Sequence, residues 1–253
     1  LSGVAVGSHT QIDSKNDLLQ RDFGDGRSWH VQIMTENTRL NINSLFLRDG
    51  LDLLRRFFRF WGLEEREVEI VVDSLADWVD SDTLRRLNGA ESVDIPLDSN
   101  WSKPENRPFL DVNEMERVRG MELVGAVCPR WKDFFSVYSG RKLDLQFVEP
   151  EMISAITGIG LDRAKKFVLL RNGKDGLAGT ADDAVFEKME DAMAILSPIG
   201  EEKILLEQNF GIGHKGLRRI VSRGEVRGTR YTIEVILAPT GGGPAQILSW
   251  KEF

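Results

Sequence analysis

The residues best able to do chemistry are carboxylates in the stretch from Leu75 to Glu91. Asp80, Asp82 and Glu91 stand at relative positions 1, 3 and 12, which are oxygen-ligand positions of a helix-loop-helix calcium loop. The glycine expected at position 6, where the chain turns sharply, is replaced by Arg85. Two interpretations follow: a structural calcium site, or a solvated acidic loop whose aspartates cap local turns.

A second group of carboxylates lies in the glycine- and aspartate-rich stretch 172–183. Asp175, Asp182 and Asp183 are candidate calcium ligands there, because glycines supply the bends that bring backbone carbonyls towards an ion. The alternative is a turn-rich loop that binds nothing.

A third feature is the Gly158-Ile-Gly160 turn between two helical patterns, which is typical of a helix-hairpin-helix motif. Such turns can bind nucleic-acid phosphate through backbone N–H groups. A second Gly-Ile-Gly at 211–213, next to basic residues, is a further candidate. The alternative is that the glycines only let two helices pack closely. A helix-hairpin-helix nucleic-acid module is therefore the second functional hypothesis.

Enzymatic chemistry has little support. The three histidines and Cys128 stand in no recognisable nucleophile, base or metal motif. A hydrolase with paired carboxylates stays open as a third hypothesis, because such pairs assemble only in space. The sequence favours a protein that is not an enzyme and has no small-molecule substrate.

Charge is distributed unevenly along the 253 residues, whose net charge is −7. Residues 64–98 carry 11 acidic and 3 basic side chains, whereas residues 201–230 carry 4 acidic and 7 basic ones. An acidic chain argues against general nucleic-acid binding, and an acidic lobe suits a protein partner or a cation. The chain starts at Leu1 and has no apolar run of membrane length, which suggests that a preceding segment has been removed.

The elements that must position these groups follow from periodicity. Alternating apolar residues predict strands over 29–34, 39–43, 143–147 and 231–237. Helical spacing predicts helices over 47–61, 64–79, 111–120, 150–156, 164–171 and 186–193, and a short one within 12–23. Strands at both ends with helices between them indicate an α+β fold with a discontinuous sheet.

Several segments share their residues and their order with one known family. Leu75-Ala-Asp-Trp-Val-Asp-Ser-Asp82 with Gly89-Ala-Glu91 resembles the signature of the K minor pseudopilin of type II secretion, the GspK family (general secretion pathway protein K). The agreeing segments are 29–33, 40–43, 105–108 with Glu114, 118–121, 158–164, 171–176 and 179–183. Leu143-Asp-Leu-Gln146 departs from the family, which has an asparagine-rich strand there.

The resemblance implies a discontinuous pseudopilin-like core with an antiparallel sheet and a large inserted helical domain. The core would comprise residues 1–43 and 226–253. Residues 44–140 would form a helical subdomain that contains the acidic loop, and residues 141–225 a second helical subdomain that contains the helix-hairpin-helix-like motif. It also implies a periplasmic ectodomain that a missing N-terminal helix anchors in the inner membrane of a Gram-negative bacterium. Partners would be the I and J minor pseudopilins at the pseudopilus tip, with bound calcium and no nucleic acid.

Overall fold

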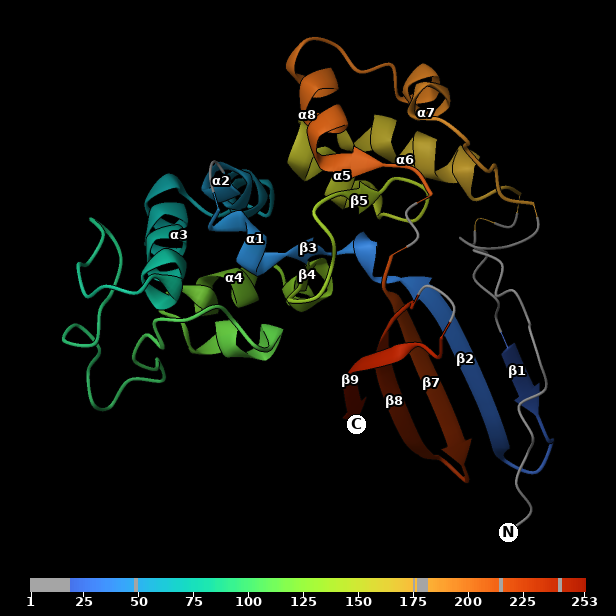
Figure 1. Ribbon diagram of the computed structural model, residues 1–253, viewed down its shortest axis with the longest axis horizontal. Coiled ribbons are helices and arrows are strands. Elements are labelled where there is room, and N and C mark those ends of the chain that lie inside the picture. Colours follow the sequence, from blue (N-terminus) through green and yellow to red (C-terminus); the bar gives the residue numbers. More distant parts are fainter. Residues whose placement is uncertain (1–18, 48–49, 175, 177–181, 214–215, 241–242) are drawn as a thin grey trace.

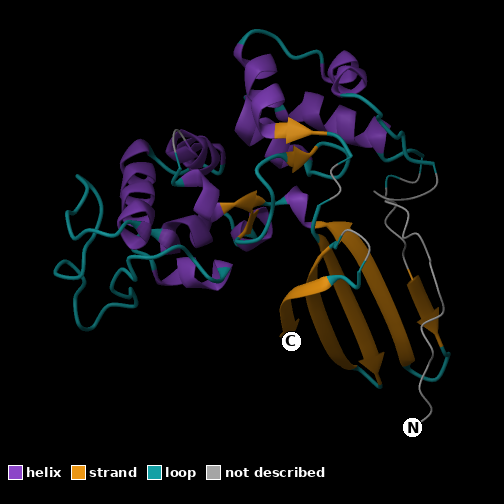
Figure 2. Ribbon diagram, in the orientation of Figure 1, coloured by secondary structure: helices purple, strands orange, loops and turns teal. Residues whose placement is uncertain are grey.

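The computed structural model describes residues 19–47, 50–174, 176, 182–213, 216–240 and 243–253 (Figure 1). It has an α+β fold in which one antiparallel sheet lies beside a larger helical part (Figure 2). The sheet order is β1-β2-β7-β8-β9, with β1 Leu19–Asp22, β2 Arg27–Thr35, β7 Arg218–Val226, β8 Thr229–Ala238 and β9 Gln246–Glu252. The predicted α+β class with an antiparallel sheet is confirmed.

The register of the sheet separates an apolar face from a polar one. Ile33 pairs with Ile220, Ile220 with Val235, and Val235 with Trp250, so these side chains share a face. The same alternation adds Trp29, Val31, Val226, Tyr231, Ile233, Leu237 and Ile247 to that face. Tyr231, Ile247 and Trp250 are each more than half exposed, so the described residues leave much of this face open to solvent.

Residues 19–23 form a strand and a turn instead of the predicted short helix. Gly24 and Gly26 both adopt positive φ, and they turn the chain so that residues 19–22 pair with residues 28–31. The predicted helix rested on only a few apolar residues at helical spacing, and pairing in the hairpin outweighs that weak preference. The rest of that predicted helix lies outside the described residues.

The helical part follows β2 and returns to β7. Its first half contains η1 Glu36–Thr38, β3 Leu40–Asn41, α1 Ile42–Leu45, α2 Gly50–Phe60, α3 Glu65–Val79, η2 Val112–Arg117, α4 Met121–Val127, η3 Trp131–Phe134 and β4 Phe135–Ser136. Its second half contains β5 Leu143–Asp144, α5 Pro150–Thr157, α6 Leu161–Arg171, α7 Met189–Leu196, α8 Glu201–Asn209 and β6 Phe210–Gly211. Helices α2 and α5 contact each other, and one buried apolar cluster runs through both halves.

Two predicted strands are much shorter than expected and lie outside the sheet. Leu40–Asn41 and Leu143–Asp144 form only short parallel bridges, with β4 and β6 respectively. The first strand stops because the Asn41 side chain accepts hydrogen bonds from the N–H groups of Asn43 and Ser44 and caps α1. Local capping therefore ends the extended chain where alternation alone predicted more strand.

The segment after the second Gly-Ile-Gly is a strand and not a second hairpin of helices. Residues 218–225, assigned above to the second helical subdomain, form most of β7 between β2 and β8. Pairing on both sides explains this, because Ile220 and Val221 are β-branched residues that suit a central strand.

In the part of the chain that the structure describes, no helix has both the length and the apolar character needed to span a membrane.

Candidate functional site

Helix α3 delivers two buried carboxylates to the acidic loop. Its apolar side packs into the core, while Asp73 and Asp77, one turn apart, face the chain that follows the helix. The Asp77 carboxylate accepts from the N–H of Arg86 at 3.2 and 3.3 Å. Asp73 Oδ2 accepts from the N–H of Asn88 at 3.0 Å and from its Nδ2 at 3.1 Å. The loop backbone is thus fixed by the acids of the helix.

The loop passes so close to α3 that one position needs glycine. A Cβ on Gly89 would lie 2.0 Å from Asp77 Oδ2 and 3.2 Å from the Asp73 carbonyl carbon. From the other side, Arg119 Nη1 donates to the Gly89 carbonyl at 2.8 Å. The Gly89-Ala-Glu91 segment is therefore held against the helix, and it brings Glu91 towards the helix end.

The first set of predicted ligands lies around the end of α3. Asp80 caps the helix, and its N–H donates to the Ala76 carbonyl at 3.0 Å. Asp82 Oδ1 accepts from the N–H of Leu84 at 2.8 Å. Glu91 is only 3% exposed. Oδ1 of Asp80 and Oε1 of Glu91 are both buried without a hydrogen-bond partner.

These carboxylates are close enough to oppose one another's ionisation. Burial raises the pKa of Asp77 to about 6, and the charges of Asp80 and Glu91 add to the shift. The pKa of Asp80 is raised by burial and then by Asp82. Burial also raises the pKa of Glu91, and Asp80, Asp82 and Asp94 contribute. Asp77, which spacing did not identify, is thus the most strongly perturbed acid of the cluster.

Positive charge compensates the cluster only in part. Arg86 Nε lies 3.6 Å from Asp77 Oδ1, and its Nη2 lies 3.8 Å from Asp80 Oδ2.

The carboxylate oxygens of this cluster are ligands of the kind that calcium prefers. Within the described residues, however, no group of three or more acids, histidines or cysteines is arranged around a common point that could hold a metal ion.

The second set of predicted ligands lies in the loop after α6. Asp175 lies outside the described residues. Asp182 Oδ2 accepts from the N–H of Lys174 at 2.6 Å. Asp183 is near the buried Arg171, where its negative charge opposes the effect of burial, which lowers the pKa of that arginine to about 10. The described part of this loop therefore uses its acids for backbone and ionic contacts.

The predicted helix-hairpin-helix is present as α5, the Gly158-Ile-Gly160 turn and α6. Gly158 adopts a φ of 78°, which ends α5. The N–H of Ile159 donates to Thr157 Oγ1 at 3.1 Å, and its carbonyl accepts from Ser154 Oγ at 2.7 Å. Ile159 itself is fully buried. The N–H of Ile159, which a phosphate-binding turn would leave free, is therefore already bonded within the hairpin. This favours the interpretation in which the glycines only let the two helices pack closely.

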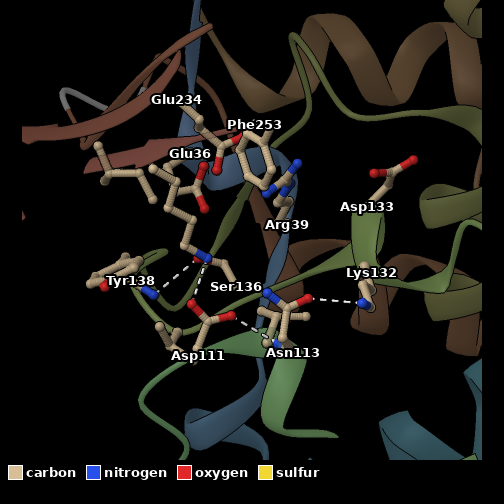
Figure 3. Close-up of a pocket in the computed structure, with 14 residues that line it drawn as sticks. Glu36, Arg39, Asp111, Asn113, Lys132, Asp133, Ser136, Tyr138, Glu234 and Phe253 are labelled. Atoms are coloured by element: carbon tan, nitrogen blue, oxygen red, sulfur yellow. Dashed lines mark hydrogen bonds and ion pairs between the residues drawn. The ribbon is translucent and has the colours of Figure 1, made fainter. Parts of the chain in front are cut away.

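A separate cavity of about 300 Å³ lies where the sheet meets the helical part (Figure 3). Asp111, at the start of η2, forms an ion pair of 2.5 Å with Lys251 of β9. Glu36 is 1% exposed, and Arg219 Nε lies 3.5 Å from its carboxylate. Burial raises the pKa of Glu36, against the opposing charge of Arg39. Sequence reasoning missed this cavity because its residues come from five segments that are distant in the sequence.

Comparisons with known proteins find related matches in sequence and in structure. Residues 38–125 match the family described as type II secretion system (T2SS), protein K. The type II secretion system protein K of Pseudomonas aeruginosa strain PAO1 is 31% identical over 101 residues, which cover 38% of this chain and 30% of that protein. The chain therefore spans less than a third of the length of this curated relative.

A structural match is to a chain in the crystal structure of the GspK–GspI–GspJ complex from the type 2 secretion system of enterotoxigenic Escherichia coli. The TM-score is 0.68, and the match covers 95% of this chain and 84% of that chain. Sequence identity is 15%, so this similarity concerns the fold.

Proposed function

We propose that this chain is a minor pseudopilin of the type II secretion system protein K family, placed at the tip of the secretion pseudopilus. The match of residues 38–125 to that family and the similarity to the Pseudomonas aeruginosa protein support this. The chain would cap the fibre or start its assembly during protein secretion across the outer membrane. The observation that carries the proposal is a shared fold over 95% of the chain, together with the family segment inside it. The role is structural and not enzymatic.

The arrangement of the chain supports a discontinuous pseudopilin-like core. Strands β1 and β2 precede the helical part, and β7, β8 and β9 follow it, so the helices are an insertion into the sheet. A bulky insertion on one side of a small sheet would hinder a further subunit from stacking above it. This is the physical reason to place the chain at an end of the fibre.

The open face of the sheet supports an anchored form of the protein. An apolar helix lying across Tyr231, Ile247 and Trp250 would remove their exposed surface from water. In the proposed full-length protein this helix would continue into the inner membrane and leave residues 19–253 in the periplasm. Trp250→Lys should then lower the Tm of the anchored protein by several degrees, whereas Thr232→Lys on the polar face should not. Equal effects of the two substitutions would contradict helix packing on this face.

The partners we propose are the I- and J-type minor pseudopilins. Mixing the purified chain with the ectodomains of both should give a three-component complex in size-exclusion chromatography with light scattering. The assembly role is wrong if the chain is folded by circular dichroism, the I- and J-type subunits are active in binding each other, and no such complex forms.

The helix-hairpin-helix alternative makes an opposite prediction. Nucleic-acid binding would appear in a filter-binding assay with duplex DNA, and it would weaken steeply as salt rises. The assembly role predicts no salt-dependent retention of DNA. The engaged N–H of Ile159 and the net charge of −7 both favour the assembly role.

We further propose that calcium stabilises the acidic loop. The specific observation is the pair of buried oxygens without partners, on Asp80 and Glu91, in a cluster that also contains Asp77 and Asp82. A divalent cation that drew these carboxylates together would offset the charge repulsion that, after burial, raises the pKa values of Asp77, Asp80 and Glu91. The second candidate set, Asp175, Asp182 and Asp183, would be a separate site.

Chelation should lower the Tm of the purified chain by several degrees, and added calcium should restore it. Glu91→Gln and Asp82→Asn should reduce this response, whereas Asp98→Asn, an exposed acid farther along the loop, should leave it unchanged. Asp175→Asn and Asp183→Asn test the second loop in the same assay. A Tm that neither chelator nor calcium changes would show that no structural calcium is bound.

A further inference from the structure

The acidic loop displays apolar side chains at positions where proteins normally place polar ones. Leu87, Val93 and Leu97 are 90%, 93% and 100% exposed. Each occupies a corner of a hydrogen-bonded turn: Gly89 N–H to Arg86 O at 3.2 Å, Asp94 N–H to Glu91 O at 2.8 Å, and Ser99 N–H to Pro96 O at 3.2 Å. Turn corners favour glycine, proline, asparagine, aspartate and serine, so local structure does not account for these three residues.

The three turns are held in place. The first is tied to α3 through the Arg86 and Asn88 N–H groups and to Arg119 through the Gly89 carbonyl. In the second, Asp94 Oδ2 accepts from the N–H of Glu91 at 2.9 Å. In the third, Ser99 Oγ donates to the Pro96 carbonyl at 2.9 Å. The first turn is thus fixed to the helical part and the other two are closed by internal hydrogen bonds, which reduces the entropy lost when a partner covers the apolar side chains.

The charge around these side chains is negative. Between Asp80 and Asp98 the sequence has five acids and two arginines, and of these acids Glu91 is buried. Both arginines pair within the loop region, Arg85 with Asp94 at 3.0 Å and Arg86 with Asp77 and Asp80. Asp82 and Asp98 are exposed. A complementary surface would be apolar in its centre and would carry lysines or arginines at its rim.

We propose that Leu87, Val93 and Leu97 form a docking surface for a protein partner whose apolar contact area is bordered by basic side chains. Figure 1 shows the loop after α3 at the end of the molecule farthest from the sheet. This surface is therefore separate from the apolar face of the sheet, and both can be occupied at once.

The test uses the full chain and a short dye-labelled amphipathic peptide of leucine and lysine, with a leucine and glutamate peptide as its counterpart. Fluorescence anisotropy should show binding of the lysine peptide only, weakening as salt rises. The triple variant L87S/V93S/L97S should bind about tenfold more weakly. The matched control L169S/I199S/I204S removes apolar residues that are 64%, 71% and 55% exposed elsewhere, and it should bind like the wild type.

Equal binding by the two triple variants, or equal binding of the two peptides, would overturn the proposal. Analytical ultracentrifugation covers a different occupant: if the wild type self-associates and L87S/V93S/L97S is monomeric, the surface binds a second copy and the proposal is wrong. Because the three side chains are 90% or more exposed, the triple variant should keep the wild-type Tm. A failed complex with the I- and J-type subunits would leave this test unaffected.

Discussion

Asp77 shows how a single buried acid can organise a loop. Its side chain has no exposed surface, it accepts the Arg86 N–H through both oxygens, and burial raises its pKa to about 6. When the pKa of an acid is higher in the folded than in the unfolded state, ionisation of that acid destabilises the folded protein. The stability it contributes when protonated is fully present below its ordinary pKa of 3.8 and is lost as the pH rises through about 6.

Asp77→Asn removes this titration. Relative to wild type, the variant should gain about 1–2 kcal/mol of unfolding free energy between pH 4 and pH 7, a reduced figure because only the loop separates Asp77 from solvent. Urea unfolding in chelator at several pH values measures this, with Asp98→Asn as the exposed control. Parallel stability curves for wild type and Asp77→Asn would contradict the raised pKa.

The sequence allowed only part of this cluster to be predicted. Asp80, Asp82 and Glu91 were identified by their spacing, and the structure places them around the end of α3. Asp77 was missed because an aspartate in an amphipathic helix normally lies on the face exposed to solvent. The available signal was the pair Asp73 and Asp77, one turn apart just before the loop, but only the path of residues 86–89 shows what the pair does.

At the scale of elements, Gly120 fixes the distance between α3 and α4. Its φ is 89°, and a Cβ there would lie 2.9 Å from Val71 Cγ2. Gly120→Ala should therefore destabilise the protein by about 2 kcal/mol, because both the backbone conformation and the packing resist a side chain.

Gly125 within α4 is the matched control. An added Cβ would meet only Trp131 Nε1, at 3.9 Å, so Gly125→Ala should stabilise the protein by up to about 1 kcal/mol through helix propensity. Thermal unfolding of the two variants compares them directly. Similar Tm changes for both would show that the contact with Val71 is unimportant.

Some elements were predictable because one strong signal defined them. The apolar spacing of α3, the alternation in β2 and β8, and the glycines between α5 and α6 each correspond to structure. The failures have two causes: β1 and β7 are defined by the strands beside them, whereas β3 is cut short by the Asn41 cap of α1. The segment 218–226 is a central strand only because β2 and β8 lie on either side of it.

At the scale of the molecule, the ion pair of Asp111 with Lys251 joins the helical part to the sheet. Burial alone would raise the pKa of Asp111, but Lys251 and the N–H of Asn113 outweigh it and hold the pKa below its usual value. Because the folded-state pKa is lowered, the stabilisation is present above the ordinary pKa and is lost as the pH falls below it.

A double-mutant cycle with Asp111→Asn and Lys251→Met should give a coupling free energy of about 0.5–1 kcal/mol at neutral pH that disappears in acid. The exposed pair Arg130 and Asp133 is the control and should show almost no coupling. Urea unfolding measures both cycles. A coupling that does not change with pH would contradict the lowered pKa of Asp111.

The separation of β2 from β7 in the chain has a consequence for biosynthesis. As the polypeptide enters the compartment in which it folds, β2 has only β1 to pair with until all of residues 36–217 have arrived. The helices rely on nearer neighbours and can condense early, whereas a lone two-stranded hairpin is marginal in water. The newly made protein should therefore pass through an intermediate in which the helical part is folded but one edge of β2 is unpaired. A chaperone that binds unfolded segments would recognise this edge.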